Sequence, residues 1–181
     1  INHLGPQSLQ HSAWCSAKGR MLVSFLFYRH GDGYRALLSS DLVEATQKRL
    51  QMYVLRAKVS ISRLHESHAL IGIAGPDART ALAQAGLDAP AEAMHRAENA
   101  RGDVLALSDQ RFVVVIPAHE VQSVWTALTT AARPAGRLAW QWMDIRDGLP
   151  LICEATKEAF VPQMADFDRI GGVSFHKGCY P

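Results

Sequence analysis

The residue whose neighbours best suit chemistry is Cys179, in the run Lys177-Gly178-Cys179-Tyr180. The thiolate is the reactive form of cysteine, and an ammonium such as that of Lys177 lowers the pKa of a nearby thiol. Gly178 also lets the backbone approach a ligand closely. A single cysteine is more often a small buried hydrophobe. The sequence therefore leaves two interpretations, a functional thiol and a packing residue.

A second group of candidates lies between residues 138 and 146. The pattern predicts a strand over 138–145, and a period of two then places Trp140, Trp142, Asp144 and Arg146 on one face. Two indoles on one face could stack against a flat heterocycle while Arg146 or Asp144 contacts its polar edge. Paired indoles on a strand also serve in packing. Both interpretations stay open on the pattern alone.

The common catalytic and metal-binding signatures are absent from the sequence. It contains no G-x-x-x-x-G-K-[ST], no G-x-G-x-x-G and no G-x-S-x-G, which removes the main support for nucleotide-binding and serine-hydrolase functions. His119-Glu120 begins like H-E-x-x-H, but Ser123 stands where the second histidine belongs. His65 and His68 lie in a segment that reads as strand and turn. No metal site is predicted.

Composition and charge describe an ordinary folded chain. The 181 residues are 48% hydrophobic and 20% charged, enough for one domain or two small lobes. The longest apolar run, 21–28, is far shorter than the ~20 residues of a membrane helix. The net charge is only +2, with basic residues spread along the chain, so we expect no direct nucleic-acid contact. Three cysteines without C-x-x-C suit a reducing compartment, and we expect a cytoplasmic protein.

The elements predicted to carry these residues alternate between hairpins and helices. Two apolar runs flank His30-Gly31-Asp32-Gly33, which is typical of a tight hairpin turn. Asp41, followed by Glu44, predicts the capped start of a helix. The expected elements are a hairpin over 21–38, a helix over 41–54, strands at 59–61 and 68–74, a helix over 76–85, a hairpin over 103–116 and a helix over 118–132. This order predicts an α+β fold of antiparallel sheets with helices packed on one face.

Several of these runs resemble the signature of the YgfZ family, folate-binding proteins related to the aminomethyltransferase (T-protein) of the glycine cleavage system. The matching residues are 160–164, Phe167-Asp168, 171–175 and 177–181, with further similarity at 15–20 and 144–150. The resemblance covers nearly the whole chain. The family pattern continues past K-G-C-Y with x-G-Q-E, so we expect this chain to be a fragment that lacks residues at both ends.

The resemblance implies an aminomethyltransferase-like, folate-binding fold with two α+β lobes and a C-terminal β-barrel around a tetrahydrofolate channel. The chain would then be a partial folate-binding module without the barrel, in which 1–56 and 136–181 form one lobe and 57–135 a ferredoxin-like lobe. It further implies a role in iron–sulfur cluster assembly or repair, with iron–sulfur client enzymes as partners and an effect on tRNA modification. The alternative is a tetrahydrofolate-dependent aminomethyltransferase or demethylase.

The resemblance also assigns candidate site residues. Cys179 falls on the family cysteine, with Lys177 beside it, and Trp140 falls on a tryptophan associated with folate. Arg146 stands where the aminomethyltransferase branch has a folate-contacting glutamate, and an arginine would instead attract the anionic glutamyl tail. Trp142 is the second aromatic candidate for folate binding. Asp41 aligns with the aminomethyltransferase catalytic aspartate only across a gap, and a helix cap is its simpler role.

Overall fold

The structure is a computed structural model that describes residues 4–174, and the chain forms two compact units. Among the described residues, unit 1 contains 10–63 and 141–174, whereas unit 2 contains 4–9 and 64–140. The chain therefore leaves unit 1, forms unit 2 and returns. Among residues 4–174, no helix has both the length and the apolar character needed to cross a bilayer.

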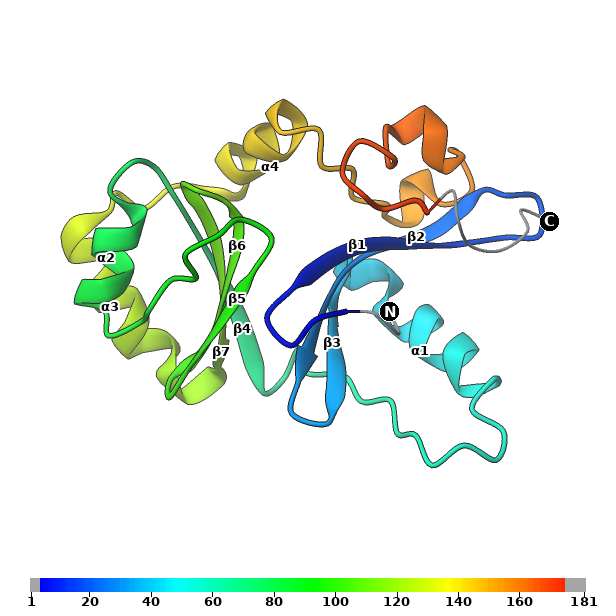
Figure 1. The fold of residues 1–181 in the computed structure, drawn as a ribbon, viewed down its shortest axis with the longest axis horizontal. Helices are drawn as coiled ribbons and strands as arrows, with labels where there is room; N and C mark the ends of the chain where they lie inside the picture. The colour runs from blue at the N-terminus through cyan, green and yellow to red at the C-terminus, as the bar shows by residue number, and fades with distance from the viewer. Residues whose placement is uncertain (1–3, 175–181) are drawn as a thin grey trace. The chain divides into compact units, whose positions relative to one another are not determined.

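Unit 1 is built on a three-stranded sheet in the order β1-β2-β3 (Figure 1), formed by Leu9–Cys15, Met21–His30 and Gly33–Leu37. The predicted hairpin is confirmed, since β2 and β3 pair antiparallel from Leu26↔Leu37 to His30↔Gly33. Gly31 supplies the positive φ of the turn, at 55°. The sheet is followed by a 3₁₀ turn, Ser40–Leu42, and helix α1, Val43–Gln51.

The core of unit 1 joins the strands to the C-terminal segment. Alternate β2 side chains Met21, Val23 and Phe25 are buried together with Ile152 and Phe167. Up to residue 174 this segment contains two 3₁₀ turns, η3 (Glu154–Thr156) and η4 (Pro162–Ala165), and is otherwise irregular. It is attached to β2 by backbone bonds, because the Met21 N–H donates to the Phe160 carbonyl and the Glu158 N–H donates to the Met21 carbonyl, both at 2.8 Å.

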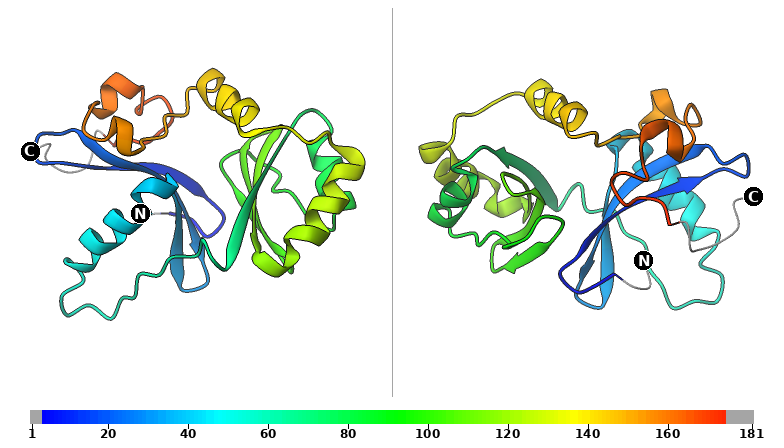
Figure 2. Two further views of the ribbon diagram at one scale, coloured as in Figure 1. Left: turned by 180° about the vertical axis from the view of Figure 1, so that it is seen from behind. Right: turned by 45° about the horizontal axis from the view of Figure 1, so that its top comes forward.

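Unit 2 is a four-stranded antiparallel sheet with helices on one face (Figures 1 and 2). The strand order is β4-β7-β6-β5, formed by His68–Ala74, Arg111–Pro117, Gly102–Ser108 and Arg96–Asn99. Helices α2 (Ala78–Gln84) and α3 (Val121–Ala131) lie against it. Buried side chains of alternate strand positions meet both helices in one core: Ile71, Ile73, Val104, Phe112, Val114, Ile116, Leu82, Val124 and Leu128.

Three sequence-based assignments differ from the structure. Residues 59–61 form no strand and lie in an extended segment after α1. Asp41 does not cap a helix; it lies inside the 3₁₀ turn, and its carboxylate accepts a bond of 3.0 Å from the Glu154 N–H. Residues 138–145 are not a strand, because helix α4 spans Arg137–Arg146. The pattern also missed β1 and β5, which are short or carry polar residues at alternate positions.

Candidate functional site

Helix α4 rearranges the aromatic face that the sequence predicted. Each helical residue turns by about 100°, so residues four apart share a side. Trp142 and Arg146 therefore lie on one side, and Trp140 and Asp144 on another. The two indoles do not form the paired platform expected of a strand.

The end of α4 shows why the helix stops where it does. The N–H of Leu149 donates to the Asp144 carbonyl at 2.9 Å, and the N–H of Gly148 donates to the Ile145 carbonyl at 3.2 Å. Gly148 has a φ of 66°, so these bonds form the Schellman motif that ends many helices. Gly148 after Arg146 was a helix-end signal in the sequence, and the alternation of indoles concealed it.

Trp142 and Arg146 form an exposed aromatic and cationic pair. The guanidinium carbon of Arg146 lies 5.3 Å from the centre of the Trp142 ring, within the range of a cation–π contact. Trp142 is 60% exposed, which is high for an indole. Arg146 also donates from Nε to Oδ1 of Asp147 at 3.0 Å. The pair can offer a ring face and a charged donor to a flat anionic ligand.

Trp140 lies in unit 2 and packs against its sheet. A Cβ added to Gly72 in β4 would meet the Trp140 ring at 2.4 Å, so the indole lies directly over this glycine. The guanidinium of Arg111, a buried residue at the start of β7, lies 4.1 Å from the ring centre. Arg111 also donates from Nη2 to the Trp140 carbonyl at 3.3 Å. These contacts show that Trp140 packs against the sheet of unit 2.

The predicted thiol and its lysine, Cys179 and Lys177, lie outside the described residues. The other two cysteines, Cys15 and Cys153, are free and partly buried. Burial raises the pKa of the Cys15 thiol, which disfavours its thiolate. No group of three or more His, Cys, Asp or Glu side chains within residues 4–174 is placed to hold a metal ion.

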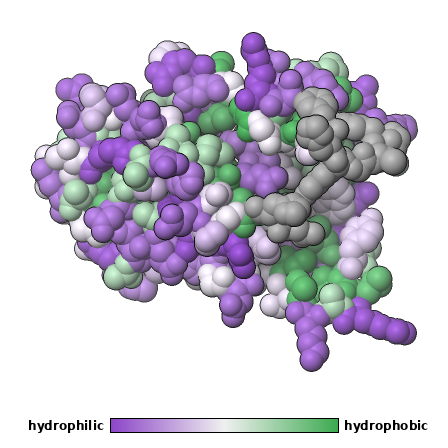
Figure 3. All heavy atoms as spheres, in the orientation of Figure 1, coloured by the Kyte–Doolittle hydropathy of each residue, from purple (hydrophilic) through white to green (hydrophobic). Residues whose placement is uncertain are grey.

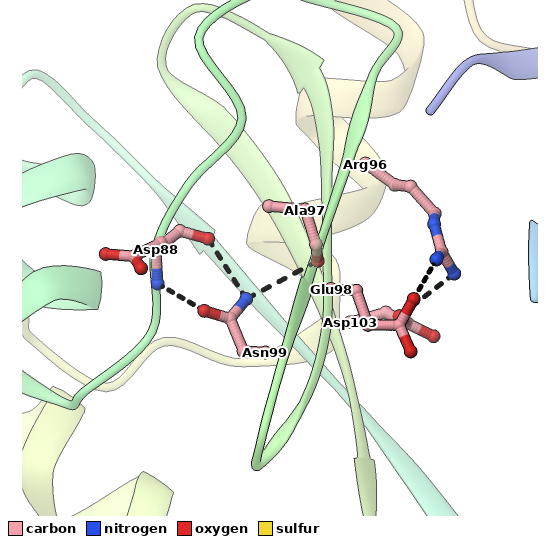
Figure 4. A network of polar contacts seen from close by, with 6 residues as sticks. All are labelled: Asp88, Arg96, Ala97, Glu98, Asn99 and Asp103. Atoms are coloured by element: carbon pink, nitrogen blue, oxygen red, sulfur yellow. Dashed lines mark hydrogen bonds and ion pairs between the residues drawn. The ribbon is translucent and has the colours of Figure 1, made fainter. Parts of the chain in front are cut away.

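The sequence patterns did not predict a polar network on β5 and β6 (Figure 4). Arg96 Nη1 donates to Oδ1 of Asp103 at 3.2 Å, and both side chains are buried. Arg96 also forms an ion pair with Glu98. At the end of the same strand, the Asn99 side chain bonds the backbone of Asp88 in both directions, at 2.7 and 3.1 Å. Arg96 and Glu98 are charged, so β5 lacked the apolar alternation by which a strand is predicted.

Comparison with known proteins gives relatives along nearly the whole chain. It is 30% identical over 182 aligned residues to the tRNA-modifying protein YgfZ of Cronobacter sakazakii, covering 99% of this chain and 55% of the relative. It is 31% identical over 169 residues to YgfZ of Edwardsiella ictaluri, covering 92% of this chain and 51% of the relative. The chain spans about half the length of the curated relatives it matches. No family model matches it.

A solved structure shows the fold. The aminomethyltransferase T of the glycine cleavage system from Bartonella henselae matches with a TM-score of 0.62, 16% identity, and coverage of 70% of this chain and 36% of that protein. At this identity the match describes architecture and no activity. The predicted α+β fold with a T-protein-like arrangement is confirmed at this level. The chain is thus a homologue of YgfZ over about half of that protein's length, and its fold is similar to part of an aminomethyltransferase T.

Proposed function

We propose that the protein is a cytoplasmic, folate-binding accessory factor that supports iron–sulfur cluster assembly or repair, and through it the modification of tRNA. The observation that carries the proposal is the similarity to proteins named as tRNA-modifying over nearly every residue of this chain. The aminomethyltransferase fold supports the folate part, because the family resemblance links that fold to tetrahydrofolate. The iron–sulfur part rests on the resemblance of the 160–181 signature.

The described residues fit part of a folate molecule. The pterin is flat, and an exposed indole such as Trp142 can stack against it. The glutamyl tail is anionic and suits the guanidinium of Arg146, which would exchange its bond with Asp147 for bonds to a ligand carboxylate. When bound, tetrahydrofolate would supply a carrier for one-carbon units. Arg146 and Trp142 are the described residues of unit 1 that we assign to holding it, and Trp140 stays the candidate assigned by the resemblance.

Binding measurements on the full-length protein test this assignment. We expect Trp142→Ala to weaken tetrahydrofolate binding by about 1–3 kcal/mol in calorimetry, taking base–aromatic stacking as the guide. Trp125→Ala is the matched control, because Trp125 is a partly exposed indole, 41%, on α3 of the other unit. Equal affinities for wild type and Trp142→Ala would remove Trp142 from the site.

The role of Arg146 is tested by the preference of the protein for polyglutamylated folate. We expect the wild type to prefer polyglutamylated over monoglutamate folate, with the preference shrinking as salt rises. Arg146→Gln should lose the preference and keep most of the affinity for the monoglutamate. An unchanged preference in Arg146→Gln would contradict a contact with the tail.

The reactivity of the Cys179 thiol distinguishes a functional role of this residue from a structural one. The experiment is iodoacetamide labelling against pH in full-length protein carrying Cys15→Ser and Cys153→Ser, with tRNA modification measured in cells for Cys179→Ser. Rapid labelling near neutral pH, together with a stable but inactive Cys179→Ser, is the expected result. Slow labelling with a destabilised but active variant would refute the functional thiol.

An aminomethyltransferase or demethylase activity is the second candidate; it rests on the family resemblance of the sequence, and the match to aminomethyltransferase T supports the fold alone. Such an enzyme needs a general base positioned near the pterin. Asp41, the carboxylate with a partial alignment, accepts the Glu154 N–H at 3.0 Å. Transfer of a labelled one-carbon unit to tetrahydrofolate by the purified protein, lost in Asp41→Asn, would favour the enzyme.

A further inference from the structure

Helix α1 and the segment after it carry an uninterrupted run of positive charge. Residues 45–64 contain five basic side chains, Lys48, Arg49, Arg56, Lys58 and Arg63, and no Asp or Glu. The whole chain has 19 basic and 17 acidic residues, so the remainder is net acidic. All five basic residues are exposed. The charge that looked dispersed in the composition is therefore concentrated on one part of unit 1.

The segment 52–63 is held to α1. Gln47 donates from Nε2 to the Ile61 carbonyl at 2.7 Å, which ties the extended chain back to the helix. A hydrogen bond from Lys48, together with the charges of Lys48 and Arg63, lowers the pKa of Glu44 near the start of α1. Lys48 and Arg63 are thus partly neutralised by Glu44. Arg56 and Lys58 have no carboxylate partner within the described residues.

An aromatic cluster lies beside this charge. Trp14 of β1 packs edge-on to Tyr53, with ring centres 6.1 Å apart and an interplanar angle of 74°. The guanidinium of Arg49 lies 5.1 Å from the centre of the Trp14 ring. Tyr53 is nevertheless 64% exposed, so its ring is held on one side and open on another. Figure 3 shows the region at the lower right, over α1 and the segment after it, where apolar side chains lie between projecting hydrophilic ones.

We propose that Arg49, Tyr53, Arg56 and Lys58, the basic α1 surface, bind RNA by contacting phosphates and stacking an unpaired base on Tyr53. Arginine and lysine side chains supply charged donors to phosphate oxygens, which position an RNA without reading its sequence. Exposed aromatic rings next to cations are the usual platform for unstacked bases in RNA. The proposal replaces the expectation, drawn from total charge, of no nucleic-acid contact.

A membrane surface and an acidic protein are the competing partners for a basic and partly apolar surface. Met52, Leu55 and Val59 are exposed here, at 66%, 87% and 60%. Interfacial helices, however, bury a long continuous apolar face. Helix α1 has only nine residues, and most of them are polar. The cluster of Trp14, Arg49 and Tyr53 favours RNA, because it fixes an aromatic ring beside cations.

The inference deepens the tRNA side of the proposed function and does not depend on folate. The experiment is fluorescence anisotropy of a labelled, unmodified tRNA transcript with full-length protein between about 50 and 200 mM salt, a range over which phosphate contacts weaken strongly. Arg56→Glu/Lys58→Glu is the test variant. Arg133→Glu/Arg137→Glu is the control, because it makes the same charge change at exposed residues of unit 2 and the start of α4.

We expect the wild type to bind the transcript with an affinity that falls steeply with salt. The test variant should lose at least about ten-fold in affinity and lower the salt slope by about two, one for each lost phosphate contact. Tyr53→Ala should lose roughly ten-fold. The control variant should bind like the wild type, and circular dichroism should show the same folded signal for all four proteins.

Three results would overturn the proposal. The first is the absence of salt-dependent binding to the transcript, and the second is equal binding by wild type, test variant and control. The third is binding to anionic phosphatidylglycerol vesicles, lost in the test variant, without binding to RNA. Tetrahydrofolate calorimetry on the same samples separates this inference from the proposed function. Retained folate affinity without RNA binding would overturn only this inference. RNA binding without folate affinity would overturn only the folate assignment.

Discussion

The packing of Trp140 on Gly72 predicts that these two positions are strongly coupled. An alanine Cβ at position 72 would lie 2.4 Å from two ring carbons of Trp140, well inside van der Waals contact. The indole cannot yield freely, since Arg111 covers its ring at 4.1 Å and bonds its carbonyl. Gly72→Ala must therefore displace the indole or shift β4 within its pairing to β7, Gly72↔Val113.

The expected magnitude follows from opposing contributions. Removing a glycine from a strand interior should stabilise by about 0.5–1 kcal/mol through lower backbone entropy in the unfolded chain. Overpacking costs about 1–3 kcal/mol, and loss of a desolvated cation–π contact about 2 kcal/mol more. We expect Gly72→Ala to lower the free energy of unfolding of unit 2 by about 2–4.5 kcal/mol, the sum of these contributions. In a Trp140→Ala background the same change should be neutral or slightly stabilising.

The assay is a double-mutant cycle read by native-state hydrogen exchange of the β4 and β7 amides, which reports on unit 2 itself. Gly136→Ala is the control, since a Cβ there meets no atom within 4 Å. If Gly72→Ala has the same effect with and without Trp140, the packing argument is wrong. The cycle also tests folate binding, because Gly72→Ala moves the indole without deleting it.

Further predictions concern a strained glycine, the buried ion pair and a histidine. Gly102→Ala should destabilise unit 2 by about 3 kcal/mol or more in urea unfolding, because φ is +148° and the new Cβ would lie 2.4 Å from the Val115 carbonyl oxygen. Arg96→Met should cost about 3–5 kcal/mol by breaking the buried ion pair with Asp103, and adding Asp103→Leu should recover part of the loss. Burial lowers the pKa of His11 below 6.5, so the unfolded state binds more protons and stability should fall as pH drops below about 6.5. His11→Gln should flatten that dependence in thermal melts at a series of pH values.

Much of the fold could be predicted because its elements have strong local signals. The hairpin at β2 and β3 follows from two apolar runs around Gly31-Asp32, and α3 follows from apolar spacing at Val124 and Leu128. Strand β5 could not be predicted by this route. The buried side chain of this strand is the charged Arg96, whose burial depends on its ion pair with Asp103 of the next strand. Such pairing is a tertiary property that no local window contains.

The error at α4 shows how secondary structure decides a site even when residue types are identified. Read as a strand, residues 138–145 place both indoles and Arg146 on one ligand-facing surface. In the helix, Trp142 and Arg146 lie on one side, and Trp140 packs over Gly72. The sequence carried the deciding signal in Gly148, the helix-ending glycine two residues after Arg146. Trp140, which matches the family position, is therefore a packing residue, and the exposed ring belongs to Trp142 two positions along the chain. Trp142 is thus the first indole to replace in a folate-binding experiment.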